Sequence, residues 1–69
     1  MSVIARNARI IINEKGLRHN YVAEKAGIDK KLFSALLTGR KIMREEHIVS
    51  IAKALDVTPN QLFEPSQAS

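Results

Sequence analysis

The pattern of apolar residues along the chain predicts a first helix over residues 3–15. Three apolar residues in this segment are spaced i, i+4 and i+7, which places them on one helix face as the expected inward stripe: Ile4, Ala8 and Ile11. Ser2 is a suitable N-cap for this helix, and Gly16 follows it as a C-cap.

Two further helices are predicted on either side of Gly27. The first covers residues 19–26, and its expected inward residues are Val22, Ala23 and Ala26. It stops at Gly27 because glycine tolerates a left-handed φ without a Cβ penalty. The next helix begins after Asp29, a good N-cap, and ends before Gly39; its expected inward residues are Phe33, Leu36 and Leu37.

Two more helices complete the pattern. One covers residues 45–55, with acidic residues in its first turn, where they suit the helix dipole, and an inward face of Ile48, Ile51, Ala52 and Leu55. The other is short, with Thr58 as its N-cap and Pro59 at the first helical position. Its two apolar residues are expected to pack back on the core: Leu62 and Phe63.

These segments predict one compact, all-α, five-helix domain over residues 1–64 and a flexible tail over residues 65–69. A domain of this size buries only about 60% of its unfolded surface, which favours a locally connected helical bundle. The chain has no cysteine, which excludes a disulfide scaffold and a thiolate zinc site, and with only two histidines no metal site is expected. No cofactor and no small-molecule ligand are expected either. The missing cysteine also favours a reducing, cytoplasmic setting, and no apolar run is long enough for a membrane span.

Positive charge is concentrated in the middle of the chain. The chain carries a net charge of +4. Residues 25–44 hold six Lys or Arg against one acid, a local charge of +5, so the remainder carries −1. A local cation excess is the expected footprint of a polyanionic partner. One Tyr and two Phe are too few for the stacking platform of a single-strand or RNA binder.

The segment VAEKAGI, residues 22–28, joins the second and third predicted helices through a tight turn at Gly27. Ala23 lies four residues before this glycine, where a larger side chain would keep the two helices from crossing closely. With this turn, the chain resembles the Cro/CI-type, lambda-repressor-like helix-turn-helix proteins of temperate bacteriophages and their bacterial relatives. The resemblance covers roughly residues 4–63 and also includes Gly16, Phe33, Leu36, Gly39 and the segment IAKALDVTPNQLF of residues 51–63.

The resemblance implies that the third helix is a recognition helix in the major groove of an operator, and that the second helix crosses the DNA backbone. It places Lys30 and Lys31 in the exposed first turn, within reach of guanine or phosphate, and Leu32 near a thymine methyl group. The helix end and the following loop would contact the backbone. The full set of implied DNA-binding residues is His19, Asn20, Lys30, Lys31, Leu32, Ser34, Thr38, Arg40 and Lys41.

Two features depart from the family pattern. Arg18 stands where relatives usually carry a Ser or Thr cap, so we expect the second helix to fray or to begin one or two residues later. Many relatives pair an arginine late in the first helix with a glutamate late in the third, whereas this chain has Ile12 and Leu37 there. Exchanging both charges for apolar groups is tolerated, but exchanging one would strand the other, so the paired change supports the alignment.

Some apolar residues have no place in the predicted core. Because three isoleucines are consecutive at positions 10–12, one cannot face the interior, and we expect Ile10 to be exposed. Together with Tyr21 and Leu32 it forms a candidate protein-binding surface. His47, at the start of the fourth predicted helix, is expected to be a plain surface residue.

The sequence leaves two functions open. One is a Cro-like repressor of a temperate-phage switch, a sequence-specific binder of double-stranded DNA in the bacterial host cytoplasm; the chain shares the size of phage Cro and its lack of a further oligomerisation domain. The other is an antirepressor that binds the cognate CI-type repressor by protein–protein contact and alters its DNA binding. Residues 58–63 are as consistent with a monomer as with a homodimer. No Ser/His/Asp set or carboxylate pair can be assembled, which argues against an enzyme.

Overall fold

The computed structural model describes residues 3–63 and contains five helices in this range. They are α1 (Val3–Glu14), α2 (His19–Ala26), α3 (Lys30–Thr38), α4 (Glu45–Leu55) and α5 (Pro59–Phe63). All five predicted helices are confirmed, and the end of α1 differs from its predicted position by one residue. The predicted N-cap Ser2, the domain end at residue 64 and the tail over residues 65–69 lie outside the described residues.

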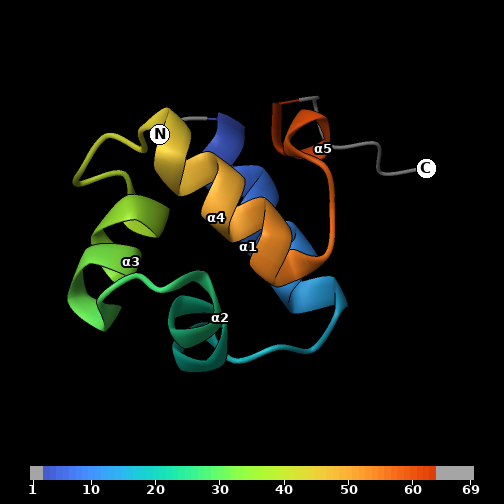
Figure 1. Ribbon diagram of the computed structural model, residues 1–69, viewed down its shortest axis with the longest axis horizontal. Helices are drawn as coiled ribbons and strands as arrows, with labels where there is room; N and C mark the ends of the chain where they lie inside the picture. The colour runs from blue at the N-terminus through green and yellow to red at the C-terminus, as the bar shows by residue number, and fades with distance from the viewer. Residues whose placement is uncertain (1–2, 64–69) are drawn as a thin grey trace.

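The helices pack around one core (Figure 1). α1 and α4 lie one behind the other across the middle of the molecule, and α5 packs against both. α2 packs on α4, α3 packs on α1, and the two helices also contact each other. The outer surfaces of α2 and α3 therefore face away from α5. Within residues 3–63, none of the helices has the length and apolar character needed to cross a bilayer.

The interior of this bundle is apolar. Its largest fully buried side chains are Phe33, Ile12, Leu36, Leu37, Ile51, Leu55, Leu62 and Val22. Ile12 and Leu37, the two positions at which relatives carry charges, are 2% and 1% exposed. A charge introduced at either position alone would therefore lose its contact with water.

The buried face of α1 is wider than the predicted stripe. Ala5, Ala8 and Ile12 are fully buried, whereas Ile4 and Ile11 are half-buried and pack against the edge of the core. The reason is that α3, α4 and α5 all contact α1. Its buried surface is therefore wider than the single stripe that the sequence spacing indicates.

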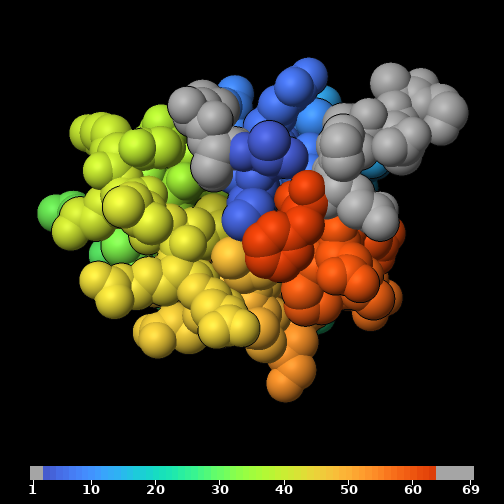
Figure 2. Space-filling view, turned by 90° about the horizontal axis from the view of Figure 1, so that it is seen from above, coloured from blue at the N-terminus to red at the C-terminus, as the bar shows by residue number. Residues whose placement is uncertain are grey.

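α1 and α5 are joined by a buried hydrogen bond that the sequence did not indicate. Asn7 is 4% exposed, and its Nδ2 donates to the carbonyl oxygen of Leu62 at 2.8 Å. Figure 2 shows the start of α1 beside the end of α5. The prediction that Phe63 packs on the core is wrong, because this side chain is 53% exposed. A five-residue helix has only one narrow inward face, and Leu62 occupies it.

A left-handed residue closes α2 and sets the direction of α3. Gly27 has φ +72°, and its N–H donates to the carbonyl of Glu24 at 3.1 Å. The N–H of Ile28 donates to the carbonyl of Ala23 at 2.9 Å. Ala23 is 1% exposed, as expected for the small residue between two closely crossing helices. After this corner only Ile28 and Asp29 precede α3.

The starts of α2 and α5 differ from the sequence prediction in their capping. Arg18 makes no side-chain capping hydrogen bond, yet α2 begins at His19, so the expected later start is wrong. The tertiary contacts of α2 with α3 and α4 compensate for the missing cap. At α5 the side chain of Gln61 reaches back, and its Oε1 accepts from the N–H of Thr58 at 2.9 Å.

We predict that Ile12→Arg lowers the free energy of unfolding by roughly 3–5 kcal/mol, because the guanidinium would be buried without a partner. Leu37→Glu should have an effect of similar size. The double variant should lose less than the sum of the single losses, since the two charges can then pair. Urea titration followed by far-UV circular dichroism measures all three values, and strictly additive losses would contradict the alignment with the ion pair of relatives.

Candidate nucleic-acid interface

The first turn of α3 is fixed by the side chain of Asp29. Its Oδ2 accepts hydrogen bonds from the backbone N–H of Lys31 at 3.0 Å and of Leu32 at 3.4 Å. The predicted N-cap is therefore confirmed, and the carboxylate also lies at the positive end of the helix dipole. Lys30 and Lys31 follow directly, and both side chains are exposed. The structure thus presents both lysines from a capped helix start.

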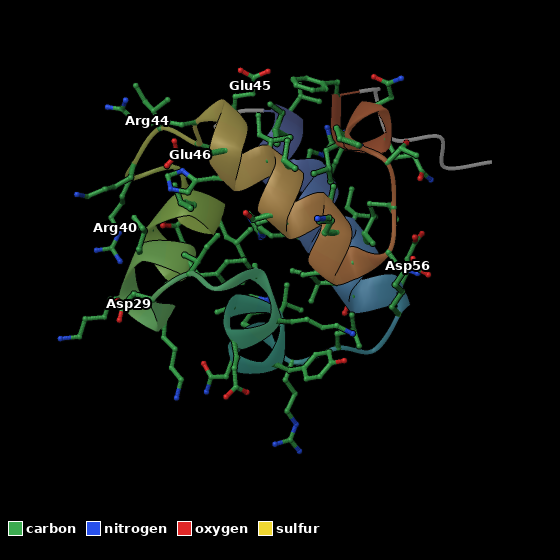
Figure 3. All side chains as sticks on the ribbon, viewed as in Figure 1. Asp29, Arg40, Arg44, Glu45, Glu46 and Asp56 are labelled. Carbon is green, nitrogen blue, oxygen red and sulfur yellow. The ribbon has the colours of Figure 1, made fainter. Side chains whose placement is uncertain are left out.

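The other end of α3 leads into a cationic loop. Gly39 ends the helix with φ +83°, and the exposed residues Arg40 and Lys41 follow it. In Figure 3, Asp29, Arg40 and Arg44 lie on the same side of the molecule, away from Asp56. The cationic side chains at the start of α3 and in the loop after Gly39 can therefore contact the same extended ligand.

The two hydroxyl groups predicted to contact DNA are in different situations. Ser34 and Thr38 are both exposed. The Oγ1 of Thr38 donates to the carbonyl of Ser34 at 2.9 Å and lies 3.3 Å from the carbonyl of Ala35. Because its one proton is engaged inside the helix, Thr38 offers no hydroxyl donor to a phosphate in this rotamer. Ser34 is the better placed donor of the two.

Leu32 is half-buried and lines a hollow between α3 and the start of α4, which we call the loop hollow. The hollow has a volume of about 490 Å³ and is lined by Leu32, Arg40, Lys41, Ile42, Arg44 and His47. His47 is half-buried, and its Nδ1 accepts from the N–H of Arg44 at 3.2 Å. His47 is therefore part of the start of α4 rather than the plain surface residue that we expected.

Three residues of the loop hollow were missed by the sequence prediction of the site: Ile42, Arg44 and His47. Arg44 could have been included, because it lies within the segment of charge +5. Ile42 is 88% exposed. Nothing in the sequence separates it from the apolar residues that enter the core, so only the structure shows its exposure.

His19 and Asn20 are exposed at the start of α2, beside α3. The ring of His19 meets the ring of Phe33 edge to face, with centroids 6.2 Å apart and an interplanar angle of 83°. This contact places His19 beside the first turn of α3. His19 also lines a hollow on the outer side of α1, together with Arg6, Arg9, Ile10 and Asn13.

Ile10, Tyr21 and Leu32 do not form one apolar patch. They line three different hollows of the surface. Ile10 is half-buried rather than exposed. Tyr21 is 46% exposed, but the ammonium of Lys25 lies 5.6 Å from its ring centroid and donates to its Oη at 3.3 Å. The exposed apolar residue that shares a hollow with Leu32 is Ile42.

This arrangement suits a polyanion with a regular backbone. Lysine and arginine donors at the two ends of a short helix with an exposed outer face can contact phosphates on both sides of a groove, while side chains of that face reach base edges. Across residues 3–63, no three His, Cys, Asp or Glu side chains are grouped so that they could hold a metal ion.

Comparison with known proteins agrees with this geometry. Residues 9–68 match the family model of the Cro/C1-type HTH DNA-binding domain. The chain is also similar to the crystal structure of the hypothetical transcription factor NHTF from Neisseria, with 32% sequence identity and a TM-score of 0.86. That similarity covers 94% of this chain and 75% of the other. No curated protein matches the chain.

We predict that Asp29→Ala lowers the free energy of unfolding by about 1 kcal/mol, because two backbone N–H groups of α3 lose their acceptor. Asp29→Asn is the matched control, since it removes the same charge but keeps a side-chain oxygen at the N-cap. It should remain close to the parent protein in thermal or urea unfolding. Equal losses in the two variants would show that the charge, not the hydrogen bonding, stabilises this helix start.

Proposed function

Since the chain belongs to the Cro/C1-type helix-turn-helix family, we propose that it represses transcription by binding a specific double-stranded DNA operator. The observation that carries this proposal is the capped start of α3. It holds Lys30 and Lys31 at exposed positions, and the loop cations Arg40 and Lys41 follow at the other end of the same helix.

In the proposed complex, the first turn of α3 enters the major groove and the start of α2 approaches the backbone. Lys31 donates to a base edge, for which guanine O6 and N7 are the preferred acceptors. Arg40 and Lys41 contact phosphates across the groove and fix the register of α3 without reading sequence. His19 and Asn20 contact the phosphates beside α2.

We further propose that the protein acts in the lysis–lysogeny switch of a temperate phage, as a Cro-like repressor in the cytoplasm of the host. The resemblance to phage regulators supports this role. The genomic neighbourhood tests it: a divergently transcribed gene for a CI-type repressor beside this gene is expected, and a neighbourhood without phage genes would contradict the role.

We predict that Lys31→Ala and Lys41→Ala weaken DNA binding in different ways. Lys31→Ala should lower the affinity by an amount that depends on the base pair opposite it, up to about 1–3 kcal/mol. Lys41→Ala should weaken all sequences alike and reduce the salt slope by about one. Fluorescence anisotropy with duplexes selected from genomic fragments, and with single-base variants of them, measures both effects.

The parent protein is the control in these titrations. With about five phosphate contacts per protomer, its log–log dependence of affinity on salt should have a slope of about −4 to −5. A flat salt response would reject direct DNA binding. Equal loss across all sequences for both variants would reject base reading by Lys31.

A second function, modulation of a cognate CI-type repressor by protein–protein contact, is supported by the exposure of Ile42. This side chain is 88% exposed and shares the loop hollow with Leu32. The exposed side chain of Ile42 and the half-buried side chain of Leu32 together form the apolar part of this candidate protein-binding surface. In this role the protein alters the DNA binding of the repressor without requiring an operator of its own.

For this second function we predict a heterocomplex with the cognate repressor in the absence of DNA, seen as a mass increase in light scattering after gel filtration. Ile42→Glu should abolish it, because the introduced carboxylate would have to be desolvated in the interface. Val49→Glu, at a 44% exposed apolar position on α4, is the control and should leave the complex intact. Absence of any mass increase with the parent protein rejects the second function.

A further inference from the structure

We propose that the outer face of α4 binds the same face of a second copy of this chain, with the two α4 helices antiparallel. The surface concerned consists of Glu46, Val49, Ser50 and Lys53, which we call the α4 face. Glu46 and Lys53 are exposed, Ser50 is half-buried, and Val49 is 44% exposed. The association itself requires no DNA, and only its consequence for the operator rests on the proposed function.

The four residues of the α4 face lie on one side of the helix. Their spacing is i, i+3, i+4 and i+7, which brings their side chains together over two turns. The buried residues Ile48, Ile51 and Leu55 lie on the opposite side. In Figure 1, α4 lies in front of α1, and in Figure 2 its yellow and orange surface forms one edge of the molecule. The α4 face is therefore open to a partner.

The α4 face is complementary to itself when the helix is reversed. Acidic Glu46 lies at one end, basic Lys53 lies at the other, and Val49 and Ser50 lie between them. Each end residue is three positions from the nearer central residue, so the pattern is symmetric about its midpoint. In an antiparallel pair, Glu46 therefore faces Lys53 of the second copy, and Val49 faces Ser50 of the second copy. Because the contact is isologous, every interaction forms twice.

Interactions within α4 account for only part of this pattern. A glutamate in the first turn and a lysine in the last turn suit the helix dipole. Within α4, however, the positions three and four residues from Glu46 and from Lys53 carry no charge, so no ion pair between neighbouring turns can form there. Valine also has a lower helix propensity than most residues and gains nothing from exposure at position 49. A second copy supplies both the opposite charges and a surface that covers Val49.

The charges favour a second copy over a partner of one charge sign. A uniformly acidic partner would meet the carboxylate of Glu46, and a uniformly basic partner would meet the ammonium of Lys53. Like charges placed against each other in an interface are unfavourable. The reversed α4 face avoids both repulsions, because it presents a cation to Glu46 and an anion to Lys53.

The antiparallel arrangement also fits the proposed DNA binding. The two-fold axis of such a pair is perpendicular to α4 and parallel to the contact surface. In Figure 1, α2 and α3 lie on one side of α4 and α5 lies on the other. Rotation about this axis keeps α2 and α3 of both copies on the same side of the pair. Since α3 packs on α1, behind α4, the two α3 helices lie apart from the contact and can enter two half-sites of one operator.

The test is the association state of the protein without DNA, measured by sedimentation equilibrium. One helix face makes a small interface, so we expect a reversible dimer with a dissociation constant of roughly 10–100 µM. Val49→Glu should raise this constant about tenfold or more, because two carboxylates would be desolvated in the contact. Val49 lies outside the loop hollow, so this variant leaves the surface of the second proposed function intact. A parent protein that is still monomeric at about 1 mM rejects the inference.

Charge reversal tests the antiparallel register. Glu46→Lys and Lys53→Glu should each raise the dissociation constant roughly tenfold, because like charges then face each other twice. An equimolar mixture of the two variants should associate like the parent protein, since each introduced charge then faces an opposite one. Single variants that dimerise as the parent does, or a mixture that stays monomeric, overturn the inference. The helix dipole cannot produce this rescue, because each variant keeps its own altered helix in the mixture.

Glu14→Lys is the matched control, because it makes the same change of charge at an exposed residue of α1, the helix behind α4. Its dissociation constant should equal that of the parent protein. An equal loss of association in this variant would assign the effect to net charge and overturn the inference. Far-UV circular dichroism and thermal midpoints, measured at a concentration at which the parent is monomeric, establish that the variants are folded.

Failure of the proposed function gives a different result. A parent protein that dimerises through the α4 face but binds none of the genomic fragments leaves the pairing standing and rejects the DNA-binding role. A parent protein that binds DNA but is monomeric at about 1 mM leaves the proposed function standing and rejects the pairing.

Discussion

The hydrogen bonds from the start of α3 to the carboxylate of Asp29 are the interaction on which the proposed interface depends. A helix of nine residues is only marginally stable in isolation, because its few internal hydrogen bonds do not offset the unfavourable free energy of helix nucleation. α3 is therefore held by its surroundings: the left-handed corner at Gly27, the cap at Asp29 and a buried inner face. Since these restraints act on the backbone and on the inner side, the outer side of α3 can vary in sequence without altering its orientation.

The helices and their ends could be predicted from the sequence, because they depend on interactions between residues that are close together in the chain. The helix bounds follow from periodicity, and Asp29 and Gly27 act on residues within one turn of themselves. Contacts between distant segments could not be predicted in this way. The bond from Asn7 to Leu62, and the exposure of Phe63, depend on which faces of α1 and α5 meet in three dimensions.

The same distinction between local features and contacts of distant segments applies to the residues of the candidate site. The resemblance to the Cro/CI-type family indicates the lysines of α3 and the cations of the following loop, and the structure finds these side chains exposed. The engaged hydroxyl of Thr38 and the half-burial of Leu32 depend on rotamers and neighbouring loops, which a residue pattern does not specify. The same is true of Ile42, whose apolar character in a sequence would more often indicate the interior.

The pairing of α1 with α5 affects how the chain reaches its native state. The side-chain amide of Asn7 has its acceptor 55 residues later in the chain, and α1 lies against the helix that is made last among those described. During synthesis on the ribosome, one apolar face of α1 therefore remains exposed to solvent until Leu62 has been added. Formation of the finished core should thus be a late, concerted event rather than a stepwise growth from the first helix.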